Sequence, residues 1–328
     1  MAVLKVENLK THFFTKAGIV KAVDDVSFAV DAGKVLGLVG ESGSGKSVTG
    51  FSIMGLVDPP GRIVAGRVLL DGENLLAKSD DAMRKLRGDR IATIFQDPMM
   101  TLNPVLRIDT QMIETVNAHQ HVSRGKARDL ARAALGRVGL PAPEERLTAY
   151  PHQLSGGMRQ RVAIAIALLN NPRVIIADEP TTALDVTIQA QILFEVQKLA
   201  RETGTAMIWI THDLSVIAGL ADEVCVMYAG RIVESGPTAE LLDRPLHPYT
   251  AGLIASIPSR NERGKPLNQI PGMTPSLLSL KPGCAFRDRC ARADAACSTA
   301  PDITRPSAAR TLRCFHPLSE TVPVSEQM

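Results

Sequence analysis

Residues 40–47 read GESGSGKS, and this stretch decides the fold class. It matches the pattern G-x-x-x-x-G-K-[ST], in which backbone amides of a glycine-rich loop surround the phosphates of a nucleotide. The loop follows the apolar run KVLGLV (34–39) and precedes a helical pattern that extends from Lys46 to about Met54. A strand, such a loop and a helix in this order direct the loop amides and the helix N-terminus at one anion. The stretch predicts a nucleotide site rather than a flexible Gly/Ser turn.

The residues of this phosphate loop have distinct expected roles. Its glycines permit a sharp turn and a close approach of the backbone to the ligand. Lys46 is placed to reach the β- and γ-phosphates, and the Ser47 hydroxyl is an expected Mg²⁺ ligand. The loop residues expected to bind the nucleotide are Gly40, Ser42, Gly43, Gly45, Lys46 and Ser47.

A second polar group stands at the end of an apolar run. In VIIADEP (174–180), Asp178 and Glu179 follow what reads as a buried strand. Ligand groups in nucleotide-binding sheets lie at the carboxyl ends of strands. Alone, two such acids would more often be solvated side chains at a strand exit. With a phosphate loop in the same chain, Asp178 is expected to hold Mg²⁺ through water and Glu179 to act as general base on the attacking water.

Composition excludes several classes of protein. The chain has 328 residues, 45% of them hydrophobic, and a formal net charge of +3. These values argue against a disordered, collagen-like or strongly charged chain, and they carry no signal for nucleic acid. The first residues, MAVLKVENLK (1–10), lack the apolar run of a signal peptide, and no run has the length of a membrane helix. We expect a soluble, cytoplasmic protein that reaches a membrane only by docking.

Hydrophobic patterning predicts an α/β fold with a mainly parallel sheet. Short strands are expected over 3–37, mostly helix over 104–150 with GLPAPEE (139–145) as a breaker, and an apolar helix over 157–170. Further strands and helices alternate up to about Pro245, which is typical of a parallel sheet. Beyond that point Pro, Gly, Arg and Cys increase and the periodicity fades.

The stretch LSGGMRQRVAIA (154–165) resembles the signature motif of ABC-type ATPases, although Met158 stands where many members carry Gln. The resemblance continues in order along the chain. Gln96 in IFQDP resembles the glutamine loop, TTALD (181–185) the D-loop, and His212 in ITHD the switch histidine. It implies an ABC ATPase core with a phosphate loop on a mainly parallel sheet, an antiparallel β part and a helical subdomain. The expected domains are the ATPase over 1–250, with the helical subdomain at about 97–160, and a small Cys-rich C-terminal extension over 251–328.

The resemblance also implies roles for single residues. ATP would lie between two subunits, so Ser155 and Gly157 would close over the partner's nucleotide, and Asp185, at the end of the D-loop, would also belong to the nucleotide-binding residues. His212 would bond the γ-phosphate, and Gln96 would sense Mg²⁺ and the water. The residue implied to stack on adenine is Phe14, with the adjacent Phe13 and a packing role for Phe14 as open alternatives.

The sequence around these motifs resembles, more narrowly, the dipeptide, oligopeptide and nickel import group of ABC ATPases. The resemblance lies in FQDPMMTLNP (95–104), YPHQLSGGMRQR (150–161), HPYT (247–250) and IPG (270–272). It implies an ATP-hydrolysing subunit for import of di- or oligopeptides, peripheral on the cytoplasmic face of the cell membrane. The implied partners are a second, different ABC ATPase subunit, two transmembrane permeases and an extracytoplasmic solute-binding protein. Alternatives are a nickel or other small-solute importer and, less favoured, a soluble ABC ATPase acting on nucleic acid or ribosomes.

Four of the five cysteines crowd the C-terminal end with the spacing C-x5-C-x6-C-x16-C. A cytosolic location disfavours disulfides, and four thiolates suit a [4Fe–4S] cluster or Zn²⁺. The resemblance favours iron–sulfur; Zn²⁺ is the alternative, and simple reduced thiols remain open. Cys225, in EVCVMY, is expected in the core. The expected ligands are Cys284, Cys290, Cys297 and Cys314. The arginines expected to offset their charge are Arg287, Arg289, Arg292 and Arg313.

Overall fold

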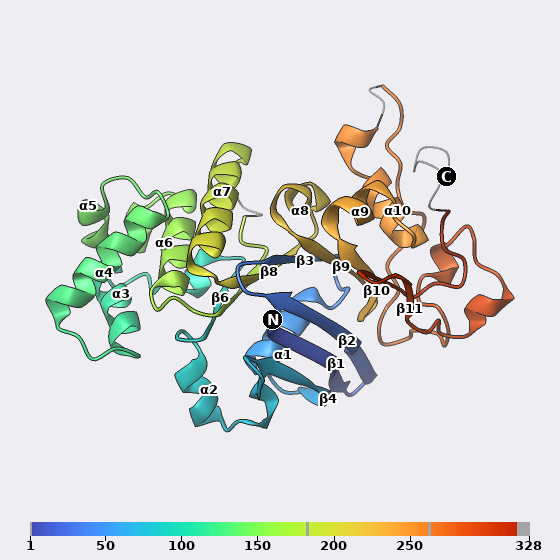
Figure 1. The fold of residues 1–328 in the computed structure, drawn as a ribbon, viewed down its shortest axis with the longest axis horizontal. Coiled ribbons are helices and arrows are strands. Elements are labelled where there is room, and N and C mark those ends of the chain that lie inside the picture. The colour runs from blue at the N-terminus through green and yellow to red at the C-terminus, as the bar shows by residue number, and fades with distance from the viewer. Residues whose placement is uncertain (1, 182–183, 262–263, 320–328) are drawn as a thin grey trace. The chain divides into compact units, whose positions relative to one another are not determined.

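The computed structural model describes residues 2–181, 184–261 and 264–319, and Figure 1 shows its elements. The chain divides into two compact units. The first is built from the runs Met1–Leu4, Val30–Val35 and Leu70–Trp209, and the second from Lys5–Ala29, Leu36–Leu69 and Ile210–Met328. Each is described by itself below.

The first unit contains three consecutive strands of one sheet, in the order β8 (Ala206–Thr211), β7 (Val174–Asp178) and β6 (Ile91–Ile94). β6 and β7 are parallel, with Ile94 opposite Ala177, so both strands end at the same edge. The four apolar residues of β7 are all buried, as in a parallel strand covered on both faces. This arrangement brings the residues that follow β6 and β7 to one edge of the sheet.

The helices of the first unit include a group in which α4 (Arg124–Arg137) packs on α3 (Ile108–Asn117), α5 (Pro143–Leu147) and α6 (Gly156–Leu168). α4 presents buried alanines at helical spacing to its neighbours, and the Ser123 hydroxyl caps its N-terminus by accepting from Lys126 N–H. The remaining elements of this unit are the short strand β5 (Glu73–Asn74) and the 3₁₀ turns η1 (Leu75–Ala77), η2 (Pro98–Met100) and η3 (Pro151–Gln153). The helices are α2 (Asp80–Leu86), α3 (Ile108–Asn117), α4 (Arg124–Arg137), α5 (Pro143–Leu147), α6 (Gly156–Leu168) and α7 (Val186–Thr203).

One expected breaker is wrong in part. GLPAPEE (139–145) was expected to interrupt helix, but α5 begins inside it at Pro143. Proline suits the first position of a helix, because its fixed φ is helical and its missing N–H has no intrahelical partner there. The turn itself is made by Ala142, which has a positive φ of 49°.

The second unit carries two groups of strands. One has the order β2 (Gly18–Asp31), β1 (Ala2–Thr15), β4 (Gly61–Leu70), and the other runs β11 (Thr304–Ser307), β12 (Arg310–Leu312), β10 (Arg231–Pro237), β9 (Glu223–Tyr228), β3 (Val35–Val39). β3 is parallel to β9, whereas β10 pairs antiparallel with β9 and β12. The helices and 3₁₀ turns are α1 (Lys46–Met54), α8 (Leu214–Leu220), α9 (Thr238–Asp243), α10 (Pro248–Ala255), η4 (Pro258–Arg260), η5 (Arg287–Arg289) and η6 (Ala295–Ser298).

Two features differ from the sequence-based expectation near the C-terminus. The stretch 304–312 forms the hairpin β11–β12 and extends the sheet from β10, although its Pro and Arg content predicts loop. Pro306 is tolerated because β11 is the terminal strand of the order. The second feature is HPYT (247–250): it lies where the sequence periodicity fades, yet it starts α10, with Pro248 at the first position and His247 as N-cap.

The structure agrees with the expected α/β class and with the helix expected from Lys46 to about Met54, which is α1. Among the described residues, no helix combines the length and apolar content needed to cross a bilayer.

Candidate functional site

The phosphate loop lies between β3 and α1. Gly45 is the N-cap of α1, with a left-handed φ of 103°, and it supplies no side-chain hydrogen bond to the first-turn amides. A Cβ at Gly40 would lie 2.2 Å from Met227 O, and one at Gly45 would lie 2.2 Å from Ala22 O. Backbone carbonyls cannot give way at that distance, so both positions require glycine. Lys46 is buried, and its Nζ donates to the carbonyls of Gly40 (2.8 Å) and Glu41 (3.0 Å).

The two neighbouring phenylalanines of β1 differ in exposure. Phe14 is 42% exposed, with the Arg62 guanidinium carbon 5.7 Å from its ring centre. Phe13 packs against Gly61, where a Cβ would lie 2.7 Å from its ring. Phe14 is therefore a partly exposed side chain and not a core residue.

Gln96 and Glu179 follow the ends of β6 and β7. Because these strands are parallel neighbours, the two side chains meet, with Gln96 Nε2 3.5 Å from Glu179 Oε2. Asp178 is the last residue of β7 and is half-buried. Glu179 has a positive φ of 44°, which a non-glycine residue rarely adopts and which occurs at functional sites. The structure thus groups the amide and the acids at one sheet edge.

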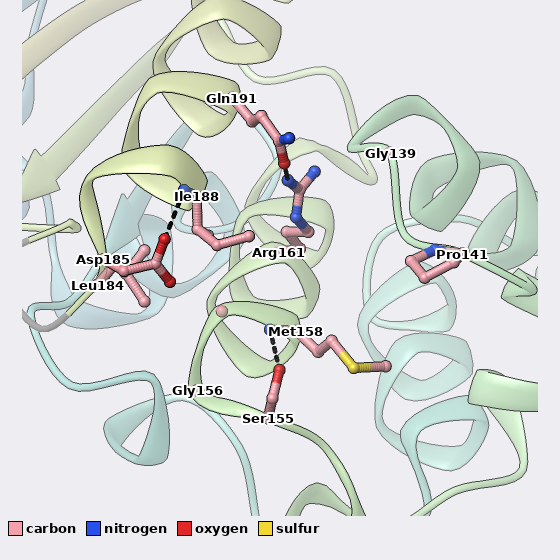
Figure 2. A pocket seen from close by; sticks show the side chains of 11 residues that line it. Gly139, Pro141, Ser155, Gly156, Met158, Arg161, Leu184, Asp185, Ile188 and Gln191 are labelled. Carbon is pink, nitrogen blue, oxygen red and sulfur yellow. Dashed lines mark hydrogen bonds between the residues drawn. The ribbon is translucent and has the colours of Figure 1, made fainter.

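The signature residues line a pocket of about 550 Å³ within the first unit, shown in Figure 2. Ser155 is the N-cap of α6 and accepts from Met158 N–H at 3.3 Å. Asp185 is the N-cap of α7 and accepts from Ile188 N–H at 3.0 Å. Two helix N-termini therefore open on the same pocket, together with Gly156 and Gly157. The positive ends of the two helix dipoles favour anions, and the Asp185 carboxylate already places one negative charge beside them.

Arg161 also lines this pocket and was not expected from sequence. It is buried, its Nη2 donates to Gln191 Oε1 at 2.8 Å and its Nη1 donates to Val138 O. Its place in the apolar helix predicted over 157–170 indicated packing only. Gly157 packs tightly on α7, since a Cβ there would lie 2.9 Å from Ile188 Cγ2.

His212 directly follows β8 and is exposed. Of the expected D-loop TTALD (181–185), Thr182 and Ala183 lie outside the described residues. Thr181 is buried, and Leu184 and Asp185 line the pocket just described.

The four C-terminal cysteines form one cluster in the second unit. The pKa of the Cys314 thiol is raised to about 11, mainly by burial and also by the charges of the other three cysteines. Burial also raises the pKa of Cys284 and Cys290, each with a contribution from Cys297. All five cysteines are described, and none is in a disulfide. Four thiols match in number the ligands that a tetrahedral Zn²⁺ or a [4Fe–4S] cluster takes.

Other donors adjoin this cluster. Asp294, Cys297 and His316 each offer one possible ligand atom, and these three atoms lie within 4.8 Å of one another. His316 Nε2 is 2.8 Å from Asp294 Oδ1. Arg292 is close enough to Cys290 to lower its pKa, against the larger effect of burial.

The charge-offsetting role was wrong for two arginines. Arg289 binds Glu41, and Arg313 binds Asp25 at 2.6 Å, so both guanidinium groups are paired with carboxylates. A carboxylate offers a planar, bidentate partner that a thiol lacks, which explains their orientation.

Comparisons with known proteins decide the family. A model described as ABC transporter matches residues 23–182, and one described as oligopeptide/dipeptide transporter, C-terminal region, matches residues 233–297. The chain is 46% identical to the oligopeptide transport ATP-binding protein OppD of Escherichia coli (strain K12), over 97% of this chain and 94% of that protein. The chain belongs to the ABC transporter ATPase family. This confirms the resemblance seen in the motifs, and as an ABC ATPase the protein hydrolyses ATP.

Two further comparisons agree with the assignment of this chain to the ABC transporter ATPase family. The dipeptide transport ATP-binding protein DppD of Bacillus subtilis (strain 168) is 47% identical, over 95% of this chain and 94% of that protein. Among solved structures, the dimeric ABC transporter cassette MJ0796 matches with a TM-score of 0.65 and 30% identity, covering 72% of this chain and 98% of that one.

Proposed function

We propose that this ABC ATPase energises the import of di- and oligopeptides through a membrane transporter. The observation that carries the proposal is the near-full-length similarity to oligopeptide and dipeptide transport ATP-binding proteins, together with a match to the C-terminal region model of such transporters. It is the similarity over residues 233–297, beyond the ATPase motifs, that favours peptides as the cargo.

The proposed chemistry is in-line attack of water on the γ-phosphate. Glu179 polarises the water, Asp178 and Ser47 hold Mg²⁺, and Gln96 senses both the ion and the water. His212 forms a hydrogen bond with the γ-phosphate, and Phe14 stacks on adenine. The 3.5 Å distance between Gln96 Nε2 and Glu179 Oε2 supports this assignment, because the amide lies beside the carboxylate that we propose as general base.

The assembly we propose is a pair of ABC ATPase subunits with two permeases and an extracytoplasmic solute-binding protein. The protein is then peripheral on the cytoplasmic face of the membrane, and its pairing partner is a second, related ATPase. The pocket shared by Ser155, Gly157 and Asp185 supports a role toward the partner's nucleotide, because two helix N-termini open on it. The proposed domains are the ATPase, 1–250 with a helical part at about 97–160, and a C-terminal extension, 251–328.

The decisive variant is Glu179→Gln in the assembled transporter. We expect it to bind ATP but to hydrolyse it about 100-fold more slowly or worse, the usual loss for a missing general base. Labelled peptide should then fail to enter vesicles. Glu202→Gln, at an exposed position near the end of α7, is the matched control and should keep both activities. ATP hydrolysis near the wild-type rate in Glu179→Gln would refute the role of Glu179 as general base. ATP-driven transport of another solute without peptide uptake would refute peptides as the cargo.

We further propose that Cys284, Cys290, Cys297 and Cys314 hold a [4Fe–4S] cluster, with Zn²⁺ as the alternative. The mutual interaction of the four thiols supports a four-thiolate site, whereas the nearby Asp294 and His316 suit zinc. Such a cluster would supply a structural crosslink or a redox-active group. Anaerobic purification should yield brown protein containing iron and sulfide; colourless protein with stoichiometric zinc would decide for the alternative.

A further inference from the structure

Glu41, the second residue of the phosphate loop, is where the C-terminal part of the chain contacts that loop. Its carboxylate accepts two hydrogen bonds from Arg289, from Nη1 to Oε2 at 2.6 Å and from Nη2 to Oε1 at 3.0 Å. Thr274 Oγ1 lies 3.2 Å from the same Oε2, and the Glu41 N–H donates to Tyr249 Oη at 2.8 Å. Residues more than 200 positions away along the chain therefore hold one residue of the loop.

Arg289 is itself held rigidly. Its side chain is only 6% exposed, and its Nε donates to Pro271 O at 2.8 Å. The guanidinium carbon lies 5.9 Å from the ring centres of both Tyr228 and Phe286, a cation–π geometry. A bidentate pair with a fixed arginine sets both the position and the orientation of the Glu41 carboxylate.

The Glu41 backbone in turn positions the lysine of the loop. Lys46 Nζ donates to Glu41 O and to Gly40 O, and Ser44 N–H also donates to Glu41 O. A displacement of Glu41 therefore moves an acceptor that holds the Lys46 ammonium. That ammonium is the group that reaches nucleotide phosphates in this motif.

Arg289 also affects the electrostatics of the phosphate loop. The Glu41 carboxylate is part of a loop that binds the negatively charged phosphates of a nucleotide, and like charges that are close together repel each other. The bidentate Arg289 pair neutralises this carboxylate. If Arg289 is lost, the nucleotide meets an unpaired negative charge and a loop that has lost its anchor.

We propose that Arg289 is a positioning residue of the ATP site: it holds and neutralises Glu41, so that a residue of the C-terminal extension belongs to the nucleotide-binding apparatus. The proposal depends on the ATPase activity of the family and not on the peptide cargo. A failure of peptide uptake therefore leaves it standing.

The test compares Arg289→Met, Arg289→Lys and the double variant Glu41→Gln/Arg289→Met in the assembled complex. KM and kcat for ATP are measured, with the affinity for a fluorescent ATP analogue. The matched control is Arg313→Met, which breaks the 2.6 Å pair with Asp25 and leaves the loop contacts untouched.

Arg289→Met should raise the KM for ATP about tenfold with kcat changed less than about threefold, the scale of losing a charge-assisted hydrogen bond. Arg289→Lys should be intermediate, because it keeps the charge and loses the fork. The double variant should recover to within about threefold of wild type, since the unpaired carboxylate is gone, and Arg313→Met should stay within about twofold.

Three outcomes would overturn the proposal. They are an unchanged KM in Arg289→Met, an equal rise in Arg313→Met, and a double variant no better than Arg289→Met. An equal rise in the control would mean that Arg289 only attaches the C-terminal residues to the unit. If Arg289→Met does not fold, the comparison of Arg289→Lys with the double variant still decides. The double variant lacks the ion pair altogether, so tighter ATP binding than in Arg289→Lys supports the neutralising role of Arg289. Weaker ATP binding than in Arg289→Lys refutes it.

Discussion

The buried ion pair between Arg310 and Glu234 offers the sharpest test of how the C-terminal residues are attached. Glu234 on β10 is fully buried, and Arg310 on β12 is 6% exposed at its side chain. Arg310 Nη2 lies 2.5 Å from Glu234 Oε1 and also donates to Arg244 O at 2.8 Å. Replacing Arg310 by methionine keeps an apolar stem of similar length but removes the positive charge.

The magnitude follows from what remains around Glu234. Removing one partner of a buried pair costs about 3–5 kcal/mol, because the other charge is left uncompensated in a medium of low polarity. Glu234 keeps two hydrogen bonds, from Leu246 N–H at 2.8 Å and His247 N–H at 3.0 Å. These donors offset part of the loss, so we expect the lower end, about 3 kcal/mol.

Urea and thermal unfolding of the full chain measure this loss. The control is Arg132→Met, which breaks the exposed pair of Arg132 with Asp129 at 3.2 Å and should cost less than about 1 kcal/mol. The double variant Glu234→Gln/Arg310→Met should recover part of the stability, because no buried charge is left without a partner. A loss below about 1 kcal/mol in Arg310→Met, equal to the surface control, would refute the reasoning.

Three further outcomes are expected. Burial lowers the pKa of His247 from 6.5 to about 3, so below pH 6.5 the unfolded chain binds the proton first and stability falls by about 1.4 kcal/mol per pH unit toward pH 3. His247→Asn should lose this part of the pH slope in urea unfolding, and an unchanged slope would contradict the assignment. Gly45→Ala should abolish ATP binding because its Cβ would lie 2.2 Å from Ala22 O, whereas Gly43→Ala, with a positive φ but nothing within 4 Å, should bind more weakly but measurably; equal affinities would refute the steric account. Burial raises the pKa of Cys225 to about 12, so a thiol reagent should label it only after unfolding, and labelling of the native protein would show that strand β9 opens.

Much of the nucleotide site is local in the sequence. The strand before the phosphate loop, the loop and α1 are consecutive, so their order alone predicts how amides and the helix N-terminus converge. The same holds for Ser155 and Asp185, whose residue types suit the N-caps that they form. That these two caps line one pocket is known only from the structure, since the pocket joins segments about 30 residues apart.

The sequence by itself determined the α/β class, the family and the residues of the phosphate loop, because these depend on short-range patterns. Only the tertiary structure decided which charges pair. Arg289 and Arg313 stand beside cysteines in the sequence, yet they bind Glu41 and Asp25, each more than 240 residues away. An ion pair is selected by geometry and burial in the folded chain, and no local periodicity records that choice. In the structure, two arginines of the cysteine-rich stretch therefore pair with distant carboxylates, and one of them, Arg289, binds the phosphate loop.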